Sequence, residues 1–189
     1  MGNQYQNQKP KAGYEYLLVY KLSVPIYDLT VEFTELHIPK FSRTKDQMDQ
    51  AARSGMQNTA EGNKQQSLAG YIKLSGVSRG SFEELLKDYM AFARQKKIEI
   101  WDKNRASREI REIGEIWEII KKNPTLPDQP NFPNLPANIT QAVNLTITLI
   151  NQENYLLDKL IASLNDKHMR EGGFNERLYK KRTDYRKNH

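Results

Sequence analysis

The sequence predicts an all-α protein: an antiparallel up-and-down four-helix bundle with a short extra helix, a proline-rich loop and a basic C-terminal tail. Apolar residues recur at three- and four-residue spacing along several long stretches, which is typical of helices that bury one face. No stretch alternates apolar and polar residues as a half-buried strand does. The 189 residues fit one domain and are enough to bury a core.

The chain is basic and contains no cysteine. Its net charge of +6 and pI near 9.3 favour a polyanionic partner, although an ordinary solvated surface carries similar charge. The lack of cysteine excludes disulfides and thiolate zinc sites and suits a reducing cytoplasm, where we expect the protein. No apolar run reaches the ~18 residues of a membrane span, so we expect no membrane partner. The first residues do not resemble a signal peptide, and no phosphate-cradling motif or other cofactor signature is present.

The first helix is predicted over residues 14–37, after a disordered tail at 1–12. Two apolar rows with a seven-residue repeat run along it: Leu17, Val24, Val31 and Ile38, and Leu22, Leu29 and Leu36. A helix that is apolar on two sides is either central in its bundle or shared with a neighbouring subunit. Pro25 removes one backbone donor inside this helix and should kink it.

The second and third helices are predicted over 43–62 and 67–98. Ser42 or Thr44 can cap the second helix, and Gly62 is a natural stop because glycine takes the left-handed conformation without penalty. Ser67 can cap the third helix. Its three glycines each cost helix propensity and therefore indicate tight contact between helices: Gly70, Gly76 and Gly80.

The remaining chain alternates basic and apolar segments. Residues 96–111 form a basic connector, and a short amphipathic helix is predicted over 107–121. Five prolines between 123 and 136 exclude helix, so we expect an extended loop across a surface. A clear heptad pattern predicts the fourth main helix over 138–168. The bundle is thus assigned to 13–170 and a basic C-terminal suffix to 171–189.

Three separated stretches carry a family resemblance. They are YLLVYK at 16–21, NTAEG at 58–62 with RGSFEELLKDY at 79–89, and LINQENYLLD at 149–158 with EGGFNER at 171–177. Together they cover most of residues 14–182, and they resemble the four-helix-bundle proteins of bacterial large-subunit (23S) rRNA intervening sequences. The third stretch, with IWDK at 100–103, looks like the subgroup that carries a C-terminal suffix.

The resemblance implies an up-and-down bundle that assembles into a ring, commonly a homopentamer, without a recognised catalytic site. It also implies kinship with the accessory variability determinant proteins of diversity-generating retroelements, which bind a reverse transcriptase and nucleic acid. The chain departs from the family pattern at three places: Thr59 replaces an aliphatic residue, Pro25 interrupts the first helix, and Pro124–Pro136 lengthen the last connection.

Two sets of polar residues are candidates for chemistry. Asn58 and Glu61 lie three residues apart and, with Gly62, are interpreted as a hydrogen-bonded structural motif, with a ligand or phosphate site as the alternative. Glu83, Glu84 and Asp88 could in principle supply paired carboxylates. No Glu-x-x-His arrangement accompanies them, so we expect no metal site and no catalytic residues.

The basic connector and tail are the candidate contacts with a partner. Trp101, Tyr179 and Tyr185 lie among their cations, and such rings can stack on unpaired bases. The candidate nucleic-acid-binding residues are Arg94, Lys96, Lys97, Lys103, Arg105, Arg108, Arg177, Lys180, Lys181, Arg182, Arg186 and Lys187. We expect a non-enzymatic oligomeric scaffold that binds RNA, DNA or a reverse transcriptase. The alternative is a structural, protein-interaction oligomer with no nucleic-acid role.

Overall fold

The computed structural model describes residues 11–187, apart from the side chains of Phe174, Asn175, Arg177 and Lys180. The predicted all-α class is confirmed over this range, which contains helices and no strand. The elements are the short 3-10 helix η1 (Gly13–Tyr16) and α1 (Leu18–His37), α2 (Arg43–Asn63), α3 (Leu68–Lys96), α4 (Lys103–Glu109), α5 (Arg111–Lys122), α6 (Ile139–Glu171) and α7 (Phe174–Lys187).

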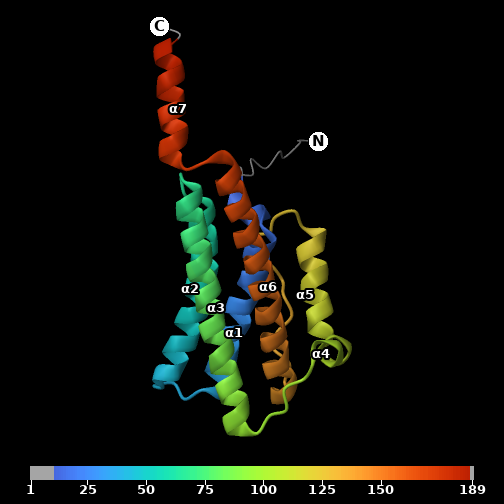
Figure 1. Cartoon of the computed structure of the whole chain (residues 1–189). Helices are drawn as coiled ribbons and strands as arrows, with labels where there is room; N and C mark the ends of the chain where they lie inside the picture. The colour runs from blue at the N-terminus through green and yellow to red at the C-terminus, as the bar shows by residue number, and fades with distance from the viewer. Residues whose placement is uncertain (1–10, 188–189) are drawn as a thin grey trace, which may run out of the picture.

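The four longest helices lie side by side, and their directions alternate along the chain (Figure 1). The most extensive contacts among α1, α2, α3 and α6 join neighbours in the cyclic order α1, α2, α3, α6. The shorter helices α4 and α5 lie beside α6 and α1 on the outside of this group (Figure 1). Of the predicted tail at 1–12, only Lys11 and Ala12 are described, and Lys11 bonds to Asp128 at 2.6 Å.

The core lies where α1, α2, α3 and α6 meet. Phe33 of α1 is fully buried, and its ring centroid lies 4.9 Å from that of Tyr89 and 5.0 Å from that of Phe92, both in α3. Leu145 and Leu149 bring α6 into the same cluster. Each such side chain contributes roughly 1.5–3 kcal/mol through its removal from water.

The second apolar face of α1 packs within the same chain. Lys21 is buried, and its Nζ donates to the carbonyl oxygens of Ile120 and Asn123, each at 3.0 Å, at the C-terminal end of α5. Further along, the Glu32 carboxylate accepts a hydrogen bond of 2.9 Å from the backbone N–H of Leu135 in the proline-containing segment. Helix α1 thus contacts α2, α5 and α6 within the protomer, while Leu17, Val24, Val31 and Ile38 remain half-buried and Leu36 is exposed. The helix also continues without interruption through Pro25.

Two expectations about glycine were wrong. A Cβ at Gly76 or Gly80 would meet no atom within 4 Å, so these glycines face open space and mark no helix contact. Gly62 lies inside α2, which ends at Asn63 with a right-handed C-cap, and it is buried against Tyr71 instead of stopping the helix. The close approach is at Gly55, where an added Cβ would lie 2.6 Å from the ring of Phe82.

The prediction of a single extra helix over 107–121 was wrong, because two helices, α4 and α5, occupy this region. Asp102 caps α4 by accepting hydrogen bonds from the backbone N–H groups of Asn104 (2.8 Å) and Arg105 (3.0 Å), so that helix begins four residues early. Ile110 then takes an extended conformation (φ −115°, ψ 100°) and separates α4 from α5. Its side chain is buried in the core.

Helix α7 projects beyond the end of the other helices (Figure 1). Gly172 ends α6 with φ of 69°, a conformation that favours glycine, and the next N–H, of Gly173, donates to Glu176 at 2.9 Å. Within residues 11–187, no helix combines the length and the apolar character needed to cross a membrane.

Candidate nucleic-acid interface

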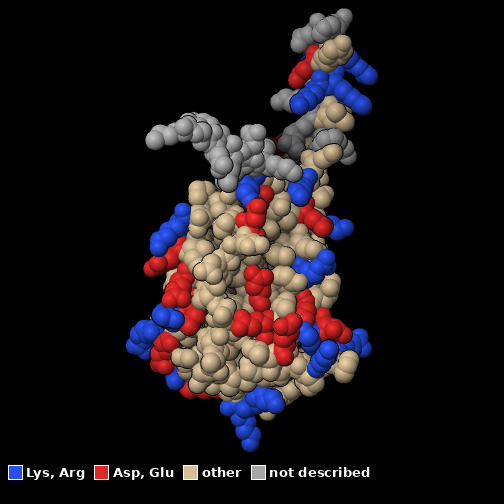
Figure 2. Space-filling model, turned by 180° about the vertical axis from the view of Figure 1, so that it is seen from behind, with Lys and Arg blue, Asp and Glu red and all other residues tan. Residues whose placement is uncertain are grey.

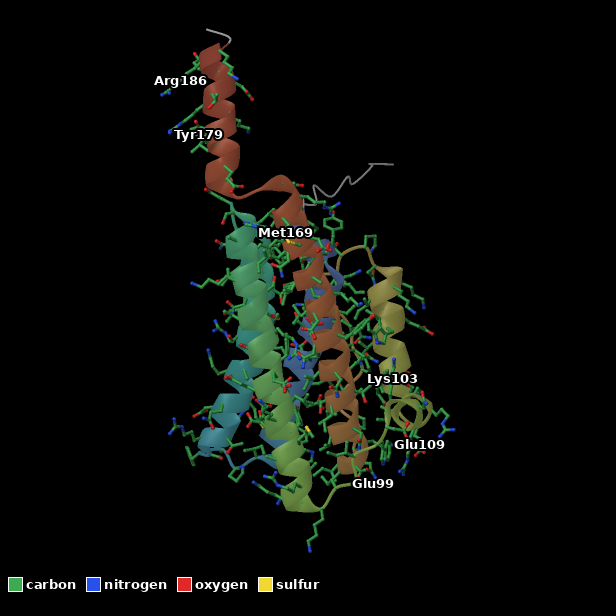
Figure 3. All side chains as sticks on the ribbon, viewed as in Figure 1. Glu99, Lys103, Glu109, Met169, Tyr179 and Arg186 are labelled. Carbon is green, nitrogen blue, oxygen red and sulfur yellow. The ribbon has the colours of Figure 1, made fainter. Side chains whose placement is uncertain are left out.

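The two predicted basic sets lie at opposite ends of the molecule. Lys103, from the connector, lies at one end, whereas Tyr179 and Arg186 lie on the projecting α7 (Figure 3). Seven Lys and Arg stand against three Asp and Glu between residues 94 and 111, and six stand against two in α7. A single protomer therefore carries two separate basic surfaces.

The connector end combines exposed cations from two helices. Arg94, Lys96 and Lys97 lie at the end of α3, and Lys103 and Arg108 lie on α4. All five are exposed, and none makes an ion pair within 4.0 Å with another described residue. Figure 2 shows blue side chains that project from the lower tip, where Figure 1 places the end of α3. These cations are available to phosphate groups.

Arg105 has a different environment from its predicted companions. Its guanidinium contacts Glu99 at 2.8 Å and Glu109 at 3.2 Å, so two carboxylates balance its charge. The same group lies over the ring of Trp101, 4.5 Å from the centroid. Arg105 therefore orients Trp101 by a cation–π contact and is a weak candidate for phosphate binding.

Asn144 attaches this segment to α6. Its side-chain oxygen accepts from the backbone N–H of Trp101 at 2.7 Å, and its amide donates to the carbonyl of Glu99 at 2.9 Å. Asn144 is itself buried, and both bonds are partly buried. The position of the Trp101 backbone is thereby fixed against α6.

An aromatic groove lies between these elements and α6. It has a volume of about 480 Å³, and three rings dominate its walls: Trp101 before α4, Trp117 on α5 and Tyr155 on α6. The other lining residues are Lys103, Ile147, Thr148, Asn151, Gln152 and Leu156. Both tryptophans of the chain thus line the same groove, and Lys103, a cation of the basic end, lines it as well.

Hydrogen bonding inside the aromatic groove is incomplete. The Trp117 indole N–H donates to the side-chain oxygen of Gln152 at 2.8 Å, which leaves the Gln152 amide hydrogens without a described partner. The indole N–H of Trp101 is buried and has no acceptor among the described residues. A ligand with acceptor atoms in the groove could accept from the Gln152 amide.

Trp117 and Tyr155 were not among the predicted site residues. A recognisable signal existed, because Thr148, Asn151, Gln152 and Tyr155 follow helical spacing and leave a polar and aromatic stripe outside the apolar rows of α6. Lys159 lies one turn further, with its Nζ 5.4 Å from the Tyr155 ring centroid. The pairing of this stripe with Trp101 required the tertiary structure.

The α7 surface carries the other predicted cations. Lys181, Arg182, Arg186 and Lys187 are exposed there, whereas the side chains of Arg177 and Lys180 lie outside the part that the structure describes. Tyr179 and Tyr185 are 74% and 66% exposed. This helix offers a second cationic surface with aromatic rings.

The Asn58, Glu61 and Gly62 motif forms no pair of the predicted kind. The Asn58 amide donates to Ser54, at 2.8 Å to its carbonyl and 3.0 Å to its hydroxyl, while Glu61 is exposed. The buried polar contact between α2 and α3 uses the neighbouring Thr59, whose hydroxyl lies 2.9 Å from that of Ser78. Ser78 also donates to the carbonyl of Gly55 at 2.7 Å.

The candidate carboxylates do not all converge. Glu84 and Asp88 line a groove between α2 and α3 together with Asp46, whereas Glu83 pairs with Arg79 at 2.9 Å and Glu61 lies elsewhere. Burial raises the pKa of Asp88, and the charge of Glu84 adds to the effect. Over the described residues, no three His, Asp or Glu side chains cluster as metal ligands would.

Comparison with known proteins gave no match. No family model, curated protein or solved structure is significantly similar to this chain. The resemblance to the rRNA intervening-sequence proteins therefore depends on the motif residues alone.

Proposed function

We propose that this protein is a non-enzymatic oligomeric scaffold that binds nucleic acid, or a nucleic-acid enzyme such as a reverse transcriptase, through its basic surfaces. The observation that carries the proposal is the connector end, where five exposed cations make no ion pair with another described residue and one of them, Lys103, lines the aromatic groove. Phosphate contacts from such cations supply affinity, and aromatic rings supply contacts to unpaired bases.

We further propose that the chain is an antiparallel four-helix bundle of the intervening-sequence type and that it forms a homopentamer. The cyclic contact order α1, α2, α3, α6 supports the bundle, and the motif resemblance supports the ring. In a ring, each subunit would repeat the same cationic end around an axis. Several weak phosphate contacts would then add through effective concentration.

The test is binding of labelled single-stranded and duplex oligonucleotides, followed by fluorescence anisotropy at 50 and 200 mM salt. We expect binding that weakens steeply with salt, because neutralised phosphates release counterions. Light scattering on the same sample should give about 110 kDa, five times the 22.0 kDa chain mass. Absence of binding at 50 mM salt would contradict the nucleic-acid role, and a monomer would contradict the assembly.

The second candidate function is a structural, protein-interaction oligomer. It is favoured by apolar side chains exposed at the turn between α1 and α2, where Leu36 is 65% and Phe41 96% exposed. Substitution of Phe41 by Ser should then lower the subunit number in light scattering. Retention of the full assembly in the variant would exclude this surface as the oligomer contact.

A further inference from the structure

We propose that the aromatic groove holds one unpaired nucleobase, so that the nucleic acid recognised at this surface is single-stranded. The inference rests on the proposed function and goes further, since it names the strandedness of the ligand and the atoms that meet it.

The walls of the aromatic groove offer ring faces to a flat ligand. Trp101, Trp117 and Tyr155 come from three different segments and line the same space of about 480 Å³. Tyr155 is 60% exposed, so its ring stands at the entrance. Every nucleobase has a π face, and stacking on such rings does not require a particular sequence.

The polar atoms of the aromatic groove suit the edge of a base. Gln152 uses its oxygen to accept from Trp117 and presents its amide hydrogens as donors. Asn151 donates to the Ile147 carbonyl at 2.9 Å, which leaves its side-chain oxygen as an acceptor. A donor and an acceptor on neighbouring residues of α6 can pair with a base edge that carries both an acceptor and a donor.

The charges around the aromatic groove place a backbone beside that base. Lys103 lines the groove itself, and Lys159 lies over Tyr155 at the rim. Arg108 is exposed further along the same short helix, α4. Phosphates that flank an inserted base would meet these cations, which an uncharged aromatic ligand would not use.

The tryptophan wall is held in place before any ligand arrives. Asn144 fixes the Trp101 backbone, and Arg105, restrained by Glu99 and Glu109, covers one face of the indole. A preformed site avoids the entropy cost of ordering on binding. Bases of a duplex are stacked and paired inside the helix, so they cannot enter without disruption.

The intrinsic fluorescence of the full chain reports this site directly, because both tryptophans lie in the aromatic groove. The experiment titrates the protein with a single-stranded deoxythymidine 10-mer and, separately, with a duplex of equal length. The single strand should quench tryptophan emission saturably, with the Kd found by anisotropy of a labelled strand. The duplex should change anisotropy without quenching.

Tyr155→Ala should weaken single-strand binding about 5- to 100-fold and leave duplex binding unchanged. Tyr16→Ala is the matched control, because Tyr16 is 56% exposed but belongs to η1, outside the aromatic groove. Circular dichroism confirms that both variants remain helical.

The outcomes separate the two proposals. Salt-dependent binding without quenching, or with no loss in Tyr155→Ala, would overturn the base-binding inference and leave the proposed function standing. Absence of binding by either oligonucleotide would overturn both. A tryptophan emission that shifts with protein concentration alone would also overturn the inference, because a second copy would then occupy the aromatic groove.

Discussion

The Gly55→Ala substitution tests how closely α2 approaches α3. The new Cβ would lie 2.6 Å from two atoms of the Phe82 ring, whereas carbon atoms normally pack about 3.5–4.0 Å apart. Phe82 is fully buried, so its ring or the two helices must shift. Overpacking of this kind costs about 1–3 kcal/mol, and alanine returns about 0.5–1 kcal/mol of helix propensity. We expect a net loss of roughly 0–2.5 kcal/mol in the free energy of unfolding, against a gain for a glycine that meets no neighbour.

Gly76→Ala in α3 is the matched control, since its Cβ would meet no atom within 4 Å. It should gain about 0.5–1 kcal/mol. Urea unfolding followed by far-ultraviolet circular dichroism measures both variants against the unmodified protein. A Gly55→Ala protein as stable as Gly76→Ala would refute the close approach of the two helices and the packing described around Phe82.

Three further substitutions test other parts of the structure. Lys21→Met should lose about 1–3 kcal/mol in urea unfolding, because two carbonyls at the end of α5 lose their buried donor; an unchanged midpoint would contradict that role. Burial raises the pKa of Glu153 well above its usual value, so the folded state binds the extra proton. The contribution of Glu153 to the free energy of unfolding should therefore be fully present at pH values below the ordinary carboxyl pKa. Above that pKa it should fall by about 1.4 kcal/mol per pH unit, until the folded-state pKa is reached. Glu153→Gln should abolish this fall in urea unfolding at pH 5, 7 and 8, and an identical pH profile would contradict it. Asn144→Ala should release the segment that carries Trp101 and shift tryptophan emission to longer wavelength, and an unshifted spectrum would show that the segment is held by other contacts.

The positions of the long helices could be predicted because periodicity and capping are local properties. Ser42 and Ser67 cap α2 and α3 as expected, since a serine before an apolar repeat satisfies exposed N–H groups wherever it occurs. The bend at Ile110 could not be predicted in this way. Its apolar side chain fits the helical repeat, so nothing in the local sequence marks the break at this buried residue.

The meaning of the apolar rows on α1 also required tertiary information. Periodicity indicated two apolar faces but not whether a second subunit or α5 covers the outer one. Lys21 illustrates the difficulty, because a lysine within an apolar stretch reads as a surface residue. It is buried here because the end of α5 supplies two carbonyl acceptors.

The candidate site was predicted in part. The cations at the end of α3 and on α4 are exposed as cations usually are, and the chain order places them near Trp101. The ion pairs of Arg105 could not be predicted from the sequence, because Glu99 and Glu109 come close to its guanidinium only in the folded segment around α4. The connector and α7 lie at opposite ends of the molecule, and the lengths of α3 and α6 set the distance between them (Figure 3).

The salt dependence of single-strand binding tests the central claim most directly. The connector variant replaces four exposed cations of the connector end by Gln: Lys96, Lys97, Lys103 and Arg108. The charge-matched control replaces four exposed cations elsewhere: Arg53, Lys64, Lys73 and Lys121.

In a plot of log Kobs against log salt, each lost phosphate contact lowers the slope by about 0.7 for a single strand. We expect a slope reduced by roughly 2–3 in the connector variant and nearly unchanged in the control. Equal slopes in the two variants would contradict it, because net charge alone would then govern binding.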